Sequence, residues 1–371
     1  MESKPNIPDK QFHRYPCPGC GADLVFEPRD GSLTCPYCGR KEIIPASAEE
    51  VVERSYEEYL RPRSDKLTTI AEDALEVRCE GCGATVSFTP PEVAGECPFC
   101  GRKIVAQPRS ADPIVAPEGV LPFQVPEPRA RDEIKKWIGS RWFAPNALKK
   151  MAYQEGVSGV YLPFWTYDAN TTSHYNGQRG EYYYVEQTYV ETDSQGRQVT
   201  KTRQVRMTRW YPASGTVTRW FDDLLVPATA SVARPRLAAL EPWDLNQLRR
   251  YEPAYLAGFK AQRYQVSLPD GFEEAKRLMA PVIEKDVSQD IGGDEQRIDR
   301  LATSYSGISF KHLLLPVYIG AYRFNEKVYQ VMVNARTGEV QGDRPYSFWK
   351  IFFFVLFIIA VIATIAVLSN R

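Results

Sequence analysis

The cysteines of this 371-residue chain form a repeated pattern that limits what its N-terminal third can fold into. All eight lie in four CxxC pairs, and fourteen residues separate the two pairs of each set. The second set repeats the first at a displacement of 62 positions, which indicates an internal duplication. The eight residues are Cys17, Cys20, Cys35, Cys38, Cys79, Cys82, Cys97 and Cys100.

This spacing is typical of structural zinc sites. Two thiolates three positions apart grip one ion only where the chain turns sharply, and a glycine follows each pair. Four thiolates at about 2.3 Å from a tetrahedral ion leave no position open for water or substrate, so the ion stabilises the fold. We therefore expect two small β zinc ribbons with four cysteines each, and two structural Zn²⁺ ions held by all eight cysteines.

Three other uses of the cysteines remain open. Disulfides need an oxidising compartment, and the polar N-terminal segment 1–10 does not resemble a secretory signal. A thioredoxin-like redox pair needs one CxxC at a strand-to-helix junction, whereas this chain has four in tandem. A rubredoxin-like iron site uses similar knuckles with a longer insert. Zinc is the metal that we favour.

The ribbons present basic and aromatic residues beside their second knuckles. The basic pairs are suited to phosphate, but such exposed pairs are more often simply solvated. The aromatic residues fit a nucleic-acid base, a pocket on a partner protein, or packing beside the zinc site. These residues are Arg40, Lys41, Arg102, Lys103, Tyr37 and Phe99.

The cysteine sets and the composition between them divide the N-terminal third. We assign zinc ribbon 1 to 12–45, a helical spacer to 46–75, zinc ribbon 2 to 76–107 and a proline-rich linker to 108–119. Within the spacer, Ser47 to Leu60 has apolar residues at helical spacing and a serine suited to cap a helix.

Residues 120–345 are expected to form a mixed α+β domain with antiparallel hairpins. Helical spacing covers Arg131 to Met151 and Phe272 to Leu301, while Val160 to Tyr167 and Leu313 to Tyr322 read as strands. Lys327 to Val340 indicates a hairpin. The order helix, strand, hairpin occurs twice, which suggests a distant internal duplication.

A long hairpin is predicted from Glu181 to Tyr211, with its turn at 193–196. Its second strand is basic, which fits an arm that binds lipid or nucleic acid. Its first strand is acidic, however, and a turn at 194–195 places Glu186 opposite Arg203. We favour a ladder of cross-strand ion pairs.

A single transmembrane helix is predicted for 347–369. Eighteen consecutive residues from Ile351 to Leu368 carry no charge, and Phe348 with Trp349 begins an aromatic belt. Arg344 and Lys350 lie on the domain side, which favours an N-in orientation. We expect a tail anchor in the inner cell membrane, with the bulk of the protein on the cytoplasmic side.

The sequence offers no catalytic constellation. The three histidines, His13, His174 and His312, are far apart, and the nucleotide-binding, metalloprotease and nucleophile-elbow motifs are absent. Asp222 and Asp223 are adjacent, and adjacent side chains usually point to different sides. We therefore do not expect them to act together as a general acid and a general base. We predict no enzyme activity and no small-molecule substrate.

Several segments together resemble bacterial membrane-associated TFIIB-type zinc-ribbon proteins. They are the tandem ribbons, GVYLPFW at 159–165, YLAGF at 255–259, LLPVYI at 314–319, VNARTGEVQGDRP at 333–345 and the terminal apolar helix. Such proteins are often catalogued as related to primosomal helicases, but this chain has no nucleotide-binding loop. The resemblance implies a membrane adaptor, some members being associated with envelope-stress systems that contain phage-shock ESCRT-III-like and SPFH-type proteins.

Two functions follow as expectations. In the first, the protein is a tail-anchored adaptor or scaffold that recruits cytosolic protein partners to the membrane. In the second, it is a membrane-tethered protein that binds nucleic acid. Lys plus Arg and Asp plus Glu both total 46, so no overall charge attracts nucleic acid, and we favour the first.

Overall fold

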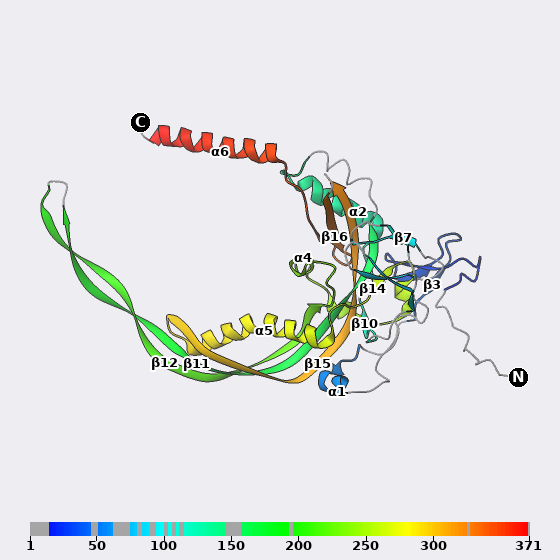
Figure 1. Cartoon of the computed structure of the whole chain (residues 1–371), viewed down its shortest axis with the longest axis horizontal. Helices are drawn as coiled ribbons and strands as arrows, with labels where there is room; N and C mark the ends of the chain where they lie inside the picture. The colour runs from blue at the N-terminus through cyan, green and yellow to red at the C-terminus, as the bar shows by residue number, and fades with distance from the viewer. Residues whose placement is uncertain are drawn as a thin grey trace.

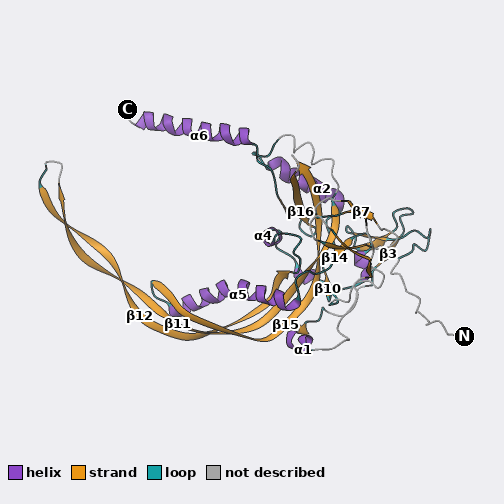
Figure 2. Ribbon diagram, viewed as in Figure 1, coloured by secondary structure: helices purple, strands orange, loops and turns teal. Residues whose placement is uncertain are grey.

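The computed structural model describes residues 15–45, 51–61, 75–79, 84–88, 94–99, 103–105, 109–110, 115–145, 157–192, 196–324 and 327–369. A large, strongly curved sheet dominates these residues, and a long hairpin extends from it (Figures 1 and 2). A three-stranded and a two-stranded sheet lie at the opposite end. The α+β class and the antiparallel hairpins predicted from the sequence are confirmed.

Three long strands form the centre of the large sheet: β11 (Ser158–Thr192), β12 (Gln198–Pro227) and β15 (Glu295–Phe324). β11 pairs antiparallel with both of the others. Among the described residues, nine shorter strands complete the sheet. They are β4 (Arg54–Ser55), β5 (Leu75–Arg78), β6 (Thr85–Phe88), β9 (Arg109–Ser110), β10 (Gly119–Val120), β13 (Arg249–Arg250), β14 (Lys260–Gln262), β16 (Lys327–Asn334) and β17 (Val340–Gly342).

Near its start, β11 is buried on both faces of the sheet. Its side chains there are mostly apolar and do not alternate with polar ones. Residues 160–169 of β11 are all buried, as the aromatic run of the sequence predicted. On the concave face lies α5 (Leu268–Ile291), whose apolar stripe packs against Tyr175, Phe221 and Phe310 (Figure 1). Gly271 of α5 lies so close to Trp165 and Tyr167 that an added Cβ would approach both within 3 Å.

The other helices are shorter and lie at the edges of the sheet. α2 (Glu127–Ser140) buries Ala130, Ile134 and Ile138 in the same cluster as β16 and β17. The remaining helical segments are α1 (Tyr56–Leu60), α4 (Arg234–Ala238) and the 3₁₀ turns η2 (Leu245–Gln247) and η3 (Pro253–Leu256).

The predicted hairpin from Glu181 to Tyr211 is present as the outer part of β11 and β12. Its register is one residue from the expected one: Glu186 lies opposite Gln204, and Arg203 lies opposite Gln187. Arg203 donates to the Gln187 side chain at 2.9 and 3.2 Å instead of pairing with Glu186. The expected Glu186–Arg203 ion pair is therefore wrong, although Lys201 and Glu191 do pair at 2.8 Å.

Two predicted helices are shorter than their periodicity suggested. Of the predicted helix from Ser47 to Leu60, residues 47–50 lie outside the described residues, and among 51–60 only α1 is helical, capped by Ser55. The residues just before it, Arg54 and Ser55, form β4 and pair with β15 in the sheet. Phe272 to Leu301 is helical only to Ile291, where glycines 292 and 293, both at positive φ, turn the chain into β15.

The C-terminal helix α6 (Phe348–Ser369) contacts the body near its start, where Phe354 packs against Trp142 and Phe143, and then extends away from it (Figure 1). It contains a stretch of 21 residues, Phe348–Leu368, that is long and apolar enough to cross a membrane. No residue of that stretch is buried against the rest of the protein. A largely exposed apolar helix of this length fits a lipid environment, so α6 could anchor the protein in a membrane.

Candidate metal centre

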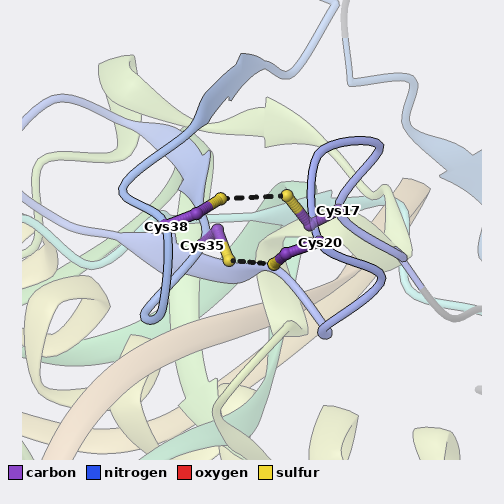
Figure 3. A group of neighbouring side chains, drawn as sticks. All are labelled: Cys17, Cys20, Cys35 and Cys38. Atoms are coloured by element: carbon purple, nitrogen blue, oxygen red, sulfur yellow. Dashed lines mark hydrogen bonds between the residues drawn. The ribbon is translucent and has the colours of Figure 1, made fainter.

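Four cysteines from the first repeat converge at one point. Cys17 and Cys20 come from one turn and Cys35 and Cys38 from another, and their sulfur atoms all lie within 4.8 Å of one another (Figure 3). The Sγ atoms are 3.4 Å apart between Cys17 and Cys38, and likewise between Cys20 and Cys35. Sulfur atoms around tetrahedral zinc are separated by about 3.8 Å, which follows from the Zn–S distance of about 2.3 Å. The cluster thus has the size of a zinc site.

Two turns of the same construction hold the sulfurs. In the first, Cys17 N–H donates to Ala22 O at 2.7 Å; in the second, Cys35 N–H donates to Arg40 O at 2.8 Å. Gly21 and Gly39 adopt positive φ angles of 76° and 71°, the left-handed conformation predicted from the glycine after each CxxC. Three short strands, β1 (Val25–Glu27), β2 (Ser32–Thr34) and β3 (Lys41–Ile43), connect and support the two turns.

The thiols are arranged to share negative charge. The backbone N–H of Cys38 is the main cause that lowers the pKa of Cys35 to about 6. The Ala22 backbone N–H favours the Cys20 thiolate, but the contact with Cys35, burial and the contacts with Cys38 and Cys17 together outweigh it and raise the pKa of Cys20 to about 12. One thiolate and one thiol therefore share this contact when no cation is bound. A divalent ion supplies the charge that allows all four sulfurs to ionise, which makes zinc the natural occupant.

The first ribbon packs onto the central body through its β1 strand. Phe26 forms edge-to-face contacts with Tyr255 and Phe259, at centroid distances of 5.6 and 6.4 Å. Its backbone N–H donates to Ala257 O at 3.0 Å. Gly258 has a φ of 85° and an added Cβ there would lie 3.1 Å from Val25, so the YLAGF segment closely fits the ribbon. The metal centre is thereby fixed to the body.

The second repeat reproduces the β2–β3 pair of the first, although its tetrad is only partly within the described residues. β7 (Ala94–Glu96) and β8 (Lys103–Val105) lie 62 residues after β2 and β3 and have the same register. Cys79 N–H donates to Ala84 O at 2.8 Å, which matches the first turn. Cys79 and Cys97 are buried, whereas Cys82 and Cys100 lie outside the described residues. A second four-cysteine cluster therefore stays a prediction.

The two repeats differ in where their aromatic knuckle residue lies. Tyr37 is 84% exposed, whereas Phe99, the equivalent residue 62 positions later, is fully buried. Phe99 packs in a cluster with Leu121, Val160 and Leu162, and its carbonyl accepts a hydrogen bond from the Gln330 side chain. The packing interpretation is therefore right for Phe99, and only Tyr37 is available to a partner.

The basic residues after the first knuckle are close to carboxylates. Lys41 forms an ion pair with Asp30, and Arg40 lies 4.0 Å from Glu42. Arg102 lies outside the described residues, and the Lys103 side chain is not described. In the first ribbon, these pairs leave little free positive charge for phosphate.

A second group of potential ligands, which the sequence did not reveal, lies at the base of the sheet. Glu53, Asp168 and Asp223 place carboxylate oxygens within 4.8 Å of one another. The ammonium of Lys311 lies among them, 2.6 Å from Asp223 and 3.0 Å from Glu53. Ser309 Oγ lies 2.8 Å from Asp168 and 2.9 Å from Glu53, so its single hydroxyl proton is shared between the two carboxylates. The lysine supplies the positive charge that a metal would otherwise bring, so this cluster serves the fold.

A β-bulge builds this acidic cluster. Two residues of β12, Asp222 and Asp223, oppose Asp168 alone, and Asp223 takes a φ of 48°. Its N–H then donates to Asp168 at 2.5 Å. Burial raises the pKa of Asp168 to about 6 despite this bond. The available sequence signal was an aspartate inside the buried aromatic run FWTYDA, not the Asp222–Asp223 pair.

Of the three histidines, the two that the structure describes lie in different environments. His13 lies outside the described residues, and His174 is exposed and lies 2.8 Å from Thr216 Oγ1. His312 is fully buried between Trp165 and Tyr264, and burial lowers its pKa to about 4. Neither described histidine approaches the cysteine cluster.

Comparisons with known proteins give one distant match over nearly the whole chain. No protein-family profile and no solved structure matches it. It is 24% identical over 349 residues to an uncharacterized protein of Bacillus subtilis, YdjG, covering 91% of each chain. It is 34% identical over 86 residues to Transcription factor S of Methanocaldococcus jannaschii, covering 23% of this chain and 65% of that protein. The cysteine cluster fits the zinc-ribbon part of the expected resemblance, while the narrower family assignment stays a prediction.

Proposed function

We propose that this protein is a non-enzymatic adaptor, anchored in a membrane by α6, whose ribbons and α+β body recruit cytosolic proteins. The proposal includes a second structural zinc ion in the second repeat, held by Cys79, Cys82, Cys97 and Cys100. It places the body on the cytoplasmic side of the inner membrane, where thiolates stay reduced. An envelope-stress system is the setting that the family resemblance favours.

The observation that carries the proposal is the exposed knuckle of ribbon 1. Phe26 docks this ribbon on the body, whereas Tyr37 and Cys38 of the second knuckle are exposed, Tyr37 by 84%. An exposed aromatic ring on a rigid, metal-braced turn is suited to fill a pocket on a partner, because little conformational entropy is lost on binding. The neighbouring ion pairs, Lys41–Asp30 and Arg40–Glu42, favour a protein partner over a polyanion.

Nucleic-acid binding is the second candidate function. The similarity of 86 residues to Transcription factor S favours it. Binding of this kind would weaken steeply as salt rises, since counterions are released from phosphate. The balanced charge of the chain and the neutralised ribbon 1 argue for the protein partner.

The paired aromatic positions of the two repeats give a matched test. Tyr37→Ala should change the free energy of unfolding by no more than about 0.5 kcal/mol, because the ring is exposed. Phe99→Ala should cost about 3–5 kcal/mol, because it empties a buried site. Urea denaturation of the full chain in detergent measures both.

A photo-crosslinking residue at position 37 then tests function in native membranes. We expect protein adducts that exceed those from the exposed helical position Arg129, and that resist nuclease. Adducts removed by nuclease would instead favour the nucleic-acid candidate. Equal, background labelling at both positions would contradict a partner at this knuckle.

A further inference from the structure

The outer part of the long hairpin is a two-stranded ribbon with two open edges. β15 pairs with β11 only as far as Gly180, which lies opposite Glu295. Beyond this point, residues 181–192 of β11 pair with residues 198–209 of β12 and with no other described strand. Figure 1 shows this arm projecting from the body. We call these two segments the arm.

The two strands of the arm carry opposite charges. The strand 181–192 contains three glutamates and no basic residue: Glu181, Glu186 and Glu191. The strand 198–209 contains four basic residues and no acid: Lys201, Arg203, Arg206 and Arg209. One edge of the arm is therefore acidic and the other basic.

Part of this charge is not paired within the arm. Arg206 lies over the ring of Tyr182, 4.2 Å from its centroid, and Arg203 binds Gln187. Among the described residues, neither has a carboxylate within ion-pair distance. Glu186 lies opposite Gln204, a neutral residue. Both edges thus retain charge that an external strand of the opposite sign would meet.

An isolated two-stranded ribbon is only marginally stable in water, and a third strand normally stabilises it. The proximal hairpin receives this strand from β15, but the arm receives none from the described residues. Its backbone edges also carry exposed apolar side chains, including Tyr184 and Val190. Uncovered strand edges of this kind are templates for pairing with another chain.

We propose that the arm binds the arm of a second copy of this chain, with the acidic edge of one copy against the basic edge of the next. Charge selects this arrangement, because joining two acidic or two basic edges would be repulsive. In an array of such arms, every strand lies between neighbours of opposite charge. The contact is heterologous, so repetition gives rings or open assemblies rather than a closed twofold dimer.

Charge-reversed full-length chains with two different tags test this proposal by co-capture from mild detergent. Wild-type copies should capture each other. Glu186→Arg and Arg206→Glu should each weaken self-capture by about tenfold, since each places like charges across the contact. Arg129→Glu on α2, an exposed reversal outside the arm, should leave capture unchanged.

Mixing the two arm variants separates loss of contact from loss of folding. The reversed edge of Glu186→Arg meets the reversed edge of Arg206→Glu, and the remaining edges are wild type, so the mixture should recover capture. Three results would overturn the proposal: wild-type copies that do not associate, reversals without effect, or a mixture as weak as either variant alone. Since none of these readouts depends on Tyr37 or zinc, the proposed adaptor function is tested separately.

Discussion

A chain that lacks residues 347–371 should leave the membrane fraction almost completely and appear in the soluble fraction. Each Ile, Leu, Phe or Val near the centre of a spanning helix favours insertion by about 0.3–0.6 kcal/mol, and α6 consists mainly of these residues. No other helix in the described part of the chain is long and apolar enough to replace it. Ultracentrifugation of lysates, followed by an alkaline carbonate wash, measures the distribution.

A replacement helix provides the matched control. Exchanging residues 351–368 for eighteen alternating leucines and alanines keeps the length and hydrophobicity of α6 but removes its sequence. This chain should stay in the carbonate-resistant membrane fraction, because lipid recognises apolar length rather than sequence. A truncated chain that resists the wash, or a replacement chain that is soluble, would show that α6 is not the anchor.

Lys311→Met should be the most destabilising single substitution in the acidic cluster. The Lys311 side chain is 8% exposed, and its removal leaves Glu53 and Asp223 without their shared cation, next to the buried Asp168. Because Glu53 and Asp223 keep partial access to water, we expect a loss near the lower limit for broken buried pairs, about 3 kcal/mol at pH 7. Urea denaturation of the full chain, followed by tryptophan fluorescence, measures the loss.

The stability lost in Lys311→Met, relative to wild type, should become smaller as the pH falls. Burial already raises the pKa of Asp168 to about 6 in the native protein, above the value of an unfolded chain. A raised carboxyl pKa means that the folded state binds the proton first, so stability from this group is present at low pH and is lost as pH rises through about 6. Wild type shares this gain, but contacts with Asp168 and Lys311 hold the pKa of Glu53 below its ordinary value against the effect of burial. Without Lys311 the pKa of Glu53 should rise, so Lys311→Met takes up more protons than wild type and recovers part of its lost stability between pH 7 and pH 5. An equal loss at both pH values would contradict the role of Lys311 as counterion, and Lys135→Met on the exposed face of α2 is the control.

Local patterns in the sequence predicted local structure well. The glycine after each CxxC predicted the left-handed turns at Gly21 and Gly39, because only a residue without a Cβ adopts them freely. The apolar run from Val160 to Tyr167 predicted a buried strand, and the turn-forming residues 193–196 between two strand-like segments predicted the long hairpin. In each case, the determining contacts lie within a few residues or within one strand pair.

Features that depend on distant contacts were not predicted. Arg54 and Ser55, inside a segment with helical spacing, form the strand β4 instead. Their backbone groups pair with β15, which lies more than 250 residues later in the chain. The bulge at Asp223 depends on Asp168, and the burial of Phe99 depends on β11 and β16. The hairpin register was wrong by one residue, because the turn length that fixes register cannot be read from charge pairing alone.

The metal content of the purified full chain tests the central claim most directly. Elemental analysis of protein extracted from membranes without chelators should find two zinc ions per chain in the wild type. Cys35→Ser should retain one, and Cys35→Ser combined with Cys97→Ser should retain none, because a tetrad that loses a thiolate binds zinc far more weakly. Wild-type protein without stoichiometric zinc, or with iron in its place, would contradict the account.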